Sequence, residues 1–351
     1  MIRSNMSTKH ISIFSRQNSY NTPSIHHAVG VARCLDAAIC LRSLDAAVNG
    51  QCIQLSPGTC SAVSATYSFR SSHYSFFRCS ESCFVRLRPA ANQVIICLMR
   101  AAQSLQSNVG GAADGQAVAF VLDATSDFMG HLPPDTEILM LRMSQERFVK
   151  IVQPWFGFAS SHQVGSLLKR AAPVEPAQFD HCVLARAVNE DDSVRMVRNT
   201  EHAGESASLE ASILLPFLGA LLPITENRLL RSPEPQHAAL VEKAVDFILR
   251  NYAERITLDD ICGECGASAS SLAAAFSRNL GLTPVRFILQ VRLQHAHTLL
   301  CSSLGRASVT NVATETGFWH YGRFSGYYRA QFLELPSETL WRFSNPETGP
   351  S

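Results

Sequence analysis

The pattern of hydrophobic and polar positions is most regular near the C-terminus of the chain. Phe324, Tyr328 and Phe332 follow Gly317 at four-residue spacing, which predicts a short helix with one aromatic face turned toward a core. The opposite face carries small residues and a cation, namely Gly322, Ser325, Gly326 and Arg329. Because that face has no apolar bulk to bury, it favours a helix laid against nucleic acid.

The same pattern occurs earlier in the chain. Gly266 is followed by an apolar stripe at Leu272, Phe276 and Leu280, and each of the two stripes is followed by a proline, Pro284 or Pro336. The two copies are in register, so the C-terminal third is predicted to contain a duplicated helical unit.

A second short helix precedes each glycine. Thr257 and Ser308 stand at the starts of these helices, with Asp260 and Asn311 three positions later, and a hydroxyl at this position caps a helix N-terminus. A helix, a glycine turn and a second helix form a helix-turn-helix unit. Two such units joined by a helix over Pro284–Leu300 form a tandem one.

At this point the chain resembles the DNA-binding domain of AraC/XylS-type transcription regulators, over roughly residues 237–342. The matching residues are ITLDDICGECGASASSLAAAFSRNLGLTPVRFILQVRLQHAHTLL, VTNVATETGFWHYGRFSGYYRAQF and Pro336, with Arg292 and Leu293 at the Arg-Leu pair of the linking helix. The resemblance implies about seven helices and two recognition helices. These would contact two successive major-groove segments of double-stranded DNA, about 34 Å apart.

The resemblance also implies which residues face DNA. In the first recognition helix they are Ser270, Ser271, Ala273, Ala274 and Ser277, and in the second they are His320, Tyr321, Gly322, Arg323, Ser325, Gly326 and Arg329. We expect the second helix to read bases through Tyr321 and Ser325, and Arg329 and Arg323 to contact phosphates. Phe318 and Trp319 are expected to hold the start of that helix by packing in a core.

Two departures from the family pattern limit this interpretation. At the positions expected to face DNA, the first recognition helix has only short side chains, which excludes bidentate hydrogen bonds to guanine or adenine. We therefore expect base specificity to come mainly from the second recognition helix. Leu333 replaces the glycine expected after Phe332, which predicts that the helix ends without a left-handed cap.

The charge distribution is consistent with nucleic-acid binding without requiring it. The whole chain has a formal net charge of +1 and 46% hydrophobic residues, which is an ordinary composition. Between Ala267 and Arg342, however, seven arginines accompany three glutamates. Such a surplus can neutralise a few phosphates and make binding salt-dependent, although scattered surface arginines would look the same.

The preceding part of the chain reads as a separate β-rich module. Three runs, QVIICLMR, QAVAFVLDA and TEILMLRM, have strand character and suggest a meander in a small barrel or sandwich. We expect an α+β chain in which residues 56–225 form an AraC-type sensory domain with a cupin-like small β-barrel. Residues 226–236, with the Pro-rich SPEPQ, are expected to be a linker, and residues 237–345 the DNA-binding domain. Residues 1–55 are poorly defined, and the polar Met1–Tyr20 has the composition of a disordered segment.

The segment Ser208–Leu222 resembles the dimerisation helix of the family by its position. Its apolar stripe is Leu209, Ile213, Leu214, Phe217 and Leu221, interrupted by Pro216. We therefore expect a homodimer that pairs through this helix. The alternative is that the stripe packs on its own barrel.

The eleven cysteines do not complete a metal or redox motif. Cys262 and Cys265 have the spacing of a zinc half-site but lie where the family has small core residues, and no second CxxC completes the ligand set. The N-terminal cysteines are scattered, which disfavours an alkyl-transfer repair enzyme with a four-cysteine zinc centre. His26, His27, His73 and His131 lack the spacing of a metal-binding barrel. No catalytic residues, metal or cofactor are therefore expected.

No apolar run approaches a membrane span, Met1–Tyr20 lacks the core of a signal peptide, and an odd cysteine count fits reduced thiols in a bacterial cytoplasm. The sequence thus predicts a DNA-binding transcription regulator that is not an enzyme. The family implies an activator that contacts RNA polymerase and responds to an unknown small-molecule effector. The alternative is a non-catalytic interaction protein whose DNA reading has decayed and which pairs with other regulators.

Overall fold

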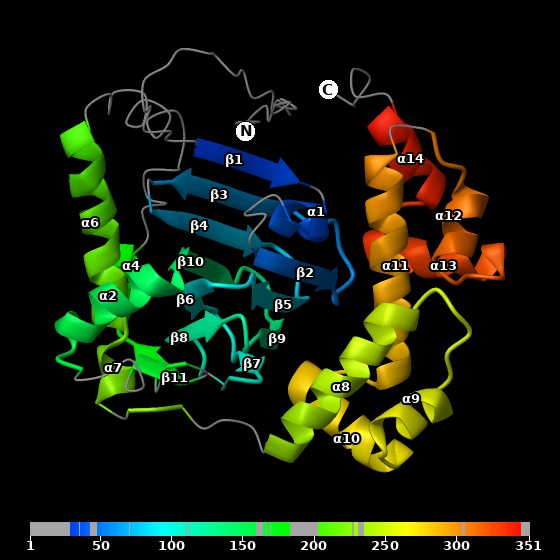
Figure 1. Ribbon diagram of the computed structural model, residues 1–351. Coiled ribbons are helices and arrows are strands. Elements are labelled where there is room, and N and C mark those ends of the chain that lie inside the picture. The colour runs from blue at the N-terminus through cyan, green and yellow to red at the C-terminus, as the bar shows by residue number, and fades with distance from the viewer. Residues whose placement is uncertain are drawn as a thin grey trace.

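The protein combines a β-rich N-terminal part with a helical C-terminal part, which confirms the α+β class (Figure 1). The computed structural model describes residues 29–34, 36–42, 48–69, 71–109, 111, 113–158, 164–165, 167–168, 170–182, 203–226, 228–230, 235–303 and 306–344. Met1–Tyr20 and residues 232–234 of the Pro-rich segment lie outside these ranges.

The β-rich part, called the N-terminal module below, consists of two antiparallel sheets. The larger has the order β1-β3-β4-β10-β6-β8-β11, with β1 Val29–Cys34, β3 Ala62–Ser68, β4 Ser72–Cys79, β10 Glu137–Ser144, β6 Gln93–Arg100, β8 Ala117–Asp123 and β11 Ala171–Val174. The smaller has the order β2-β5-β9-β7, with β2 Val48–Gln54, β5 Cys83–Pro89, β9 Phe128–Leu132 and β7 Gln106–Ser107.

The three predicted strands are confirmed as β6, β8 and β10, but the predicted meander order is wrong. β10 pairs with β6 on the edge opposite β8, because β9, which lies between β8 and β10 in the chain, belongs to the other sheet. Within the segment expected to be poorly defined, residues 29–34 form β1, Ala37–Arg42 form the helix α1, and residues 48–54 form β2. In the described residues the two sheets remain separate ladders, so closure into a barrel stays a prediction.

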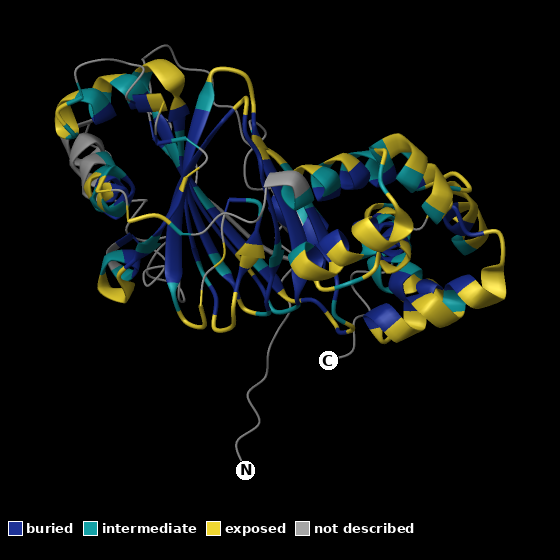
Figure 2. Cartoon of the chain, turned by 90° about the horizontal axis from the view of Figure 1, so that it is seen from below, coloured by how far each residue is buried: buried dark blue, intermediate teal, exposed yellow. Residues whose placement is uncertain are grey.

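Alternation of side chains along the strands gives each sheet two buried faces. One core lies between the sheets and includes Phe77, Phe120 and Phe128. A second lies between the larger sheet and four helices, α2 Gln145–Trp155, α4 Pro176–Cys182, α6 Ala203–Ala220 and α7 Leu222–Thr225. Figure 2 shows buried residues along the sheets and on the inward sides of the helices.

The helix expected to mediate dimerisation is α6, and its apolar stripe packs on the module itself. Ile213, Phe217 and Leu221 are buried in the core that covers the larger sheet, and Leu214 is half-buried against it. The prediction that this stripe forms an intersubunit surface is therefore wrong. The stripe instead covers an apolar face of the larger sheet of its own chain. The side chain of Leu209 lies outside the described residues.

The C-terminal part contains seven helices in the described residues, as expected. They are α8 Pro235–Asn251, α9 Leu258–Cys265, α10 Ala269–Leu280, α11 Pro284–Ser302, α12 Val309–Glu315, α13 Tyr321–Phe332 and α14 Pro336–Ser344. The helix α8 begins inside the segment predicted as a linker. Among the described helices, none combines the length and hydropathy needed to cross a membrane.

Candidate nucleic-acid interface

The first helix-turn-helix unit consists of α9 and α10. Thr257 and Asp260 form a capping box at the start of α9, with the backbone N–H of Thr257 donating to Asp260 Oδ2 at 2.7 Å. Gly266 ends α9 in the left-handed region at φ 65°, which favours glycine. Ser268 then caps α10 by accepting from the backbone N–H of Ser271 at 3.2 Å. The predicted cap at Thr257 is therefore confirmed, and the cap at Ser268 is an additional one that was not predicted from the sequence.

The second unit consists of α12 and α13. Ser308 caps α12 by accepting from the backbone N–H of Asn311 at 3.0 Å. At Gly317 (φ 81°) a Cβ would lie 2.9 Å from both Arg292 Nε and the Tyr252 carbonyl oxygen. Only glycine therefore lets this turn approach the first unit so closely.

The prediction that α13 ends without a left-handed cap is wrong. Leu333 adopts the left-handed conformation at φ 60°, and its backbone N–H donates to the Arg329 carbonyl at 2.9 Å. The left-handed cap therefore forms without glycine. The leucine side chain is 65% exposed, so the cap needs no burial of this residue.

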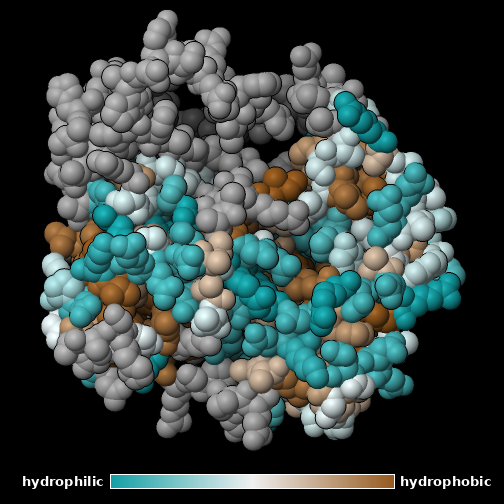
Figure 3. All heavy atoms as spheres, viewed as in Figure 1, coloured by the Kyte–Doolittle hydropathy of each residue, from teal (hydrophilic) through white to brown (hydrophobic). Residues whose placement is uncertain are grey.

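The residues expected to face DNA all lie at the surface. Those that are exposed are Ser270, Ser271, Ala274, Ser277, His320, Tyr321, Gly322, Arg323, Gly326 and Arg329, and those that are half-buried are Ala273 and Ser325. The apolar stripes on the other side of α10 and α13 are buried, as predicted. In the space-filling view, polar and neutral residues dominate the helical side of the molecule, with apolar atoms in scattered patches (Figure 3).

Two neighbouring aromatic residues just before α13 differ in burial. Phe318 is buried with its ring 4.8 Å from that of Phe324, which confirms its predicted core role. Trp319 is 41% exposed, so its predicted core packing is wrong. Its ring instead lies under two cations, 4.8 Å from Arg255 and 5.7 Å from Arg292.

Arg292 connects the two units through the linking helix α11. Its guanidinium donates to the carbonyls of Tyr252 at 2.7 Å and Glu254 at 2.6 Å, in the turn that follows α8. Burial lowers the pKa of Arg292, but an arginine remains charged. The same side chain therefore contacts the turn before the first unit by hydrogen bonds and the start of α13 in the second unit through Trp319.

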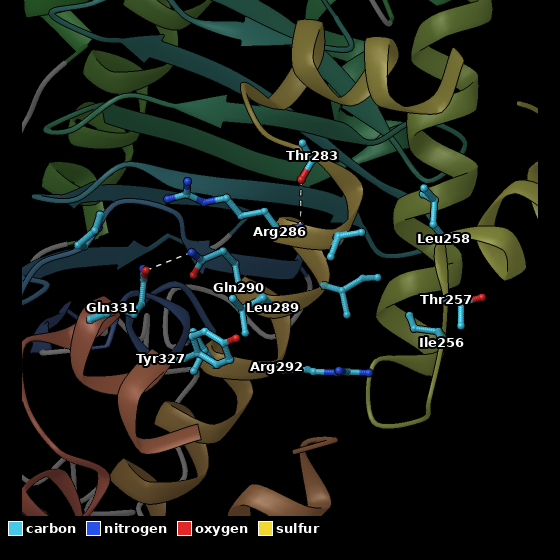
Figure 4. Close-up of a pocket in the computed structure, with 15 residues that line it drawn as sticks. Ile256, Thr257, Leu258, Thr283, Arg286, Leu289, Gln290, Arg292, Tyr327 and Gln331 are labelled. Carbon is cyan, nitrogen blue, oxygen red and sulfur yellow. Dashed lines mark hydrogen bonds between the residues drawn. The ribbon is translucent and has the colours of Figure 1, made fainter. Parts of the chain in front are cut away.

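A cavity of about 700 Å³ lies along α11 between the two units. Its walls are the start of α9, the apolar flank of α11 with Leu289, and the Tyr327 side of α13. Figure 4 shows Arg286 and Arg292 extending from α11 in different directions, while Gln290 faces Gln331 across a hydrogen bond of 3.1 Å.

The sequence did not predict how closely the helical part joins the N-terminal module. Ile53, Phe84 and Met129, on the outer face of the smaller sheet, share one apolar core with α8, α10 and α11. Phe84 and Phe287 meet edge to face with ring centroids 5.1 Å apart. Hydrophobic periodicity shows that a face is buried, but it does not show which part of the chain covers it.

The module meets the second unit through polar groups instead. Gln331 of α13 donates to the carbonyls of Gln54 at 3.2 Å and Ser56 at 2.9 Å. The N–H of Gly58 donates back to the Gln331 carbonyl at 2.9 Å, and the N–H of Gln54 donates to Gln294 Oε1 at 3.0 Å. The three glutamine side chains are buried, so the contact is a buried polar network.

Four N-terminal cysteines that look scattered in the sequence lie in one region of the module. The sulfur of Cys79 is 3.3 Å from that of Cys60 and 3.4 Å from that of Cys83, and Cys52 is buried in the same core. In contrast, Cys262 and Cys265 of the CxxC motif pack partly buried against the shared apolar core, in keeping with their predicted role as small core residues.

Comparison with known proteins finds similarity over the helical part. Residues 261–342 match a family model described as a helix-turn-helix domain. Over 100 residues the chain is 36% identical to the XylDLEGF operon transcriptional activator 2 of Pseudomonas putida, covering 28% of this chain and 64% of that protein. Over 112 residues it is 35% identical to a probable thc operon regulatory protein of Rhodococcus erythropolis, covering 32% of this chain and 34% of that protein.

A solved structure, that of a probable AraC family transcriptional regulator from Rhodopseudomonas palustris, is 37% identical, with a TM-score of 0.29, and covers 30% of this chain and 97% of that one. The matches to the two curated relatives thus span between 34% and 64% of their length.

Proposed function

We propose that this chain, as a member of the AraC/XylS family of transcription regulators, is a sequence-specific regulator that contacts two successive major-groove segments of double-stranded DNA. The observation that carries the proposal is the pair of capped units, each with a second helix whose inward face is buried and whose outward face is free. Among the outward residues, Tyr321, Arg323 and Arg329 have the reach and chemistry to contact bases and phosphates.

The proposal assigns unequal roles to the two recognition helices. The first offers Ser270, Ala274 and Ser277, which allow hydroxyl contacts and methyl packing against thymine but no bidentate base pairing. The second offers Tyr321, whose hydroxyl lies 3.2 Å from Thr314 Oγ1 of α12. This contact holds the phenol at the start of α13, where a recognition helix meets base edges.

The remaining features of the proposal come from the family and its relatives. Several relatives are named as transcription activators, which supports a role in activation, and the family resemblance implies contact with RNA polymerase. The N-terminal module would be a cupin-like sensory domain for a small-molecule effector, and two chains would pair as a homodimer in a bacterial cytoplasm. Because the stripe on α6 is used within its own module, such pairing needs another surface. No enzymatic activity is proposed.

Selection of bound sequences from random DNA by the full-length protein tests the proposal. We expect an enriched motif with most of its information in one half, the half contacted by α13. Arg329→Ala should weaken binding to all sequences and reduce the salt slope by about one unit, whereas the matched control Arg170→Ala, an exposed arginine of the N-terminal module, should change neither. Absence of any enriched motif would favour the alternative, an interaction protein that no longer reads DNA.

A further inference from the structure

Three potential metal ligands meet where the N-terminal module contacts α11. Asp36 stands just before α1, while His297 and Cys301 are one turn apart on α11, and α1 faces α11 in Figure 1. One oxygen, one nitrogen and the sulfur of these three residues all lie within 4.8 Å of one another. The residues are 2%, 3% and 5% exposed, so the cluster is closed to bulk solvent.

A chain of hydrogen bonds determines which nitrogen of His297 carries a proton. Thr339 Oγ1 donates to Glu334 Oε1 at 2.5 Å, and the Tyr328 hydroxyl donates to Thr339 Oγ1 at 2.8 Å. At 2.6 Å from His297 Nδ1, the Tyr328 hydroxyl must therefore accept from Nδ1–H, and the lone pair of a neutral imidazole lies on Nε2.

The Nε2 atom faces the other two groups. It lies 4.0 Å from Asp36 Oδ2 and 3.5 Å from Cys301 Sγ. Ligand atoms around a tetrahedral ion with bonds of about 2.0–2.3 Å are about 3.3–3.7 Å apart. The spacing of His297 and Cys301 already fits this geometry, and the Asp36 oxygen must move closer to both atoms to share one ion.

The carboxylate of Asp36 is oriented by its neighbours. Its Oδ1 accepts from the backbone N–H groups of Ala38 at 2.7 Å and Ile39 at 2.9 Å, which cap α1. Its Oδ2 accepts from Gln294 at 3.1 Å and Thr298 at 2.9 Å, both on α11. Hydrogen bonds of this kind to a carboxylate and to the far nitrogen of a histidine are typical around protein metal ligands.

We propose that Asp36, His297 and Cys301 bind a divalent metal ion of the zinc class at the junction between the N-terminal module and α11. A mixed oxygen, nitrogen and sulfur donor set suits Zn²⁺ or Co²⁺, and it suits neither Mg²⁺ or Ca²⁺, which prefer oxygen alone, nor Cu⁺, which prefers sulfur. On binding, Cys301 releases its thiol proton to solvent, and the carboxylate and thiolate together balance the charge of the ion.

The position of the site gives it a consequence for the whole chain. An ion held there joins the start of α1 to α11, and through Tyr328 it also fixes one side of α13. Metal occupancy would therefore strengthen the contact between the module and the second helix-turn-helix unit, and the melting temperature of the full chain should rise on loading.

Cobalt titration of the chelator-treated, reduced full-length protein tests the site. We expect one equivalent to give thiolate-to-cobalt charge-transfer absorption, which Zn²⁺ displaces. Cys301→Ala and His297→Gln should abolish this absorption. Tyr328→Phe keeps the ring but removes the oxygen that accepts from Nδ1–H, and should weaken cobalt binding by about 10- to 100-fold without changing the spectrum.

The matched control replaces both cysteines of the CxxC motif, as Cys262→Ser with Cys265→Ser, and should leave the absorption intact. Circular dichroism checks that each variant is folded. The proposal is overturned if the wild-type protein shows no charge-transfer band. It is equally overturned if the band survives in Cys301→Ala, or if a folded Tyr328→Phe binds cobalt as tightly as the wild type.

Discussion

The two helix-turn-helix units have the same design but differ in how they meet the rest of the chain. The first unit shares an apolar core with the smaller sheet, through Phe84, Phe276 and Phe287. The second has a core of its own around Phe318, Phe324 and Tyr328. Gln331 of its helix α13 donates to backbone carbonyls of the N-terminal module, and the neighbouring linking helix α11 contacts Asp36 through Gln294 and Thr298.

The two recognition helices also differ in their outward side chains, and here the second unit is the one with more groups able to contact DNA. The helix α10 carries serines and alanines at the outward positions expected to face DNA, with one exposed arginine, Arg278, in its last turn. The helix α13 carries Tyr321, Arg323 and Arg329 at its outward positions. Apolar burial in a shared core is strong and does not depend on the direction of the contacts. The hydrogen bonds of a buried polar network are directional, and losing some of them leaves buried polar groups unpaired at a large cost in free energy. We infer from these differences that the first unit attaches the helical part to the N-terminal module and that the second unit provides most of the base contacts to DNA.

An ion pair attaches α8, which packs against α9 and α10 of the first unit, to the smaller sheet. Arg86 of β5 donates from Nε to Asp127 at 2.7 Å and also contacts Asp246 of α8. Arg86 is buried and Asp246 is partly exposed. Because these charged groups must be correctly oriented to meet, they align α8 on the smaller sheet. Phe84 contributes the buried apolar surface of the same contact.

The largest effect is expected from Phe84→Ala. The side chain is fully buried against Phe287, so its loss should lower the free energy of unfolding by about 3–5 kcal/mol. Chemical denaturation should show the module and the first unit losing stability together. As a control, Phe120→Ala lies between the two sheets and should destabilise the module alone. If Phe84→Ala affects only the sheets, the shared core does not couple the two parts.

The next effect concerns base preference. Tyr321→Ala should relax selectivity at one base pair by roughly 1–3 kcal/mol, because it removes the largest outward side chain at the start of α13. Ser277→Ala on the first recognition helix is the matched control and should change selectivity little. Competition binding against a panel of single-base variants of the selected site measures both. Equal losses from the two substitutions would remove the proposed asymmetry between the helices.

A smaller effect is expected where the two units touch each other. Trp319→Ala removes the ring that lies under Arg255 and Arg292, a cation–π contact worth about 0.5–1 kcal/mol at an exposed position. We expect a small loss of stability together with weaker binding to sites that span both half-sites. Phe318→Ala, the buried neighbour, should cost several times more free energy of unfolding. If Trp319→Ala weakens binding to a single half-site as strongly as to the full site, Trp319 touches DNA itself.

Local chemistry made much of the helical part predictable from the sequence. The capping residues Thr257 and Ser308, the glycine turns and the four-residue aromatic spacing each act within one turn of helix, and all are observed as expected. The strands β6, β8 and β10 were also recognisable, because continuous apolar runs of this length are typical of buried strands.

What could not be predicted depends on contacts between distant segments. Strand order, the use of the α6 stripe within its own module and the approach of Asp36 to His297 join residues far apart in the chain. No local pattern encodes them. The same holds for Trp319, whose exposed position depends on where Arg255 and Arg292 lie.

The smallest effect is expected from Leu333→Gly, which tests the end of α13. A leucine in the left-handed region costs about 1–2 kcal/mol, and glycine relieves this while losing about 0.5–1 kcal/mol through its greater freedom in the unfolded chain. Because Leu333 is mostly exposed, little burial is lost, and we expect a net gain of a few tenths of a kcal/mol, about the difference between these two costs. Leu299→Gly is the matched control, since Leu299 is also partly exposed but lies inside α11, where glycine should destabilise by about 1 kcal/mol. Thermal denaturation of both variants measures the contrast, and a loss of stability at both positions would mean that the cap at Leu333 is unstrained.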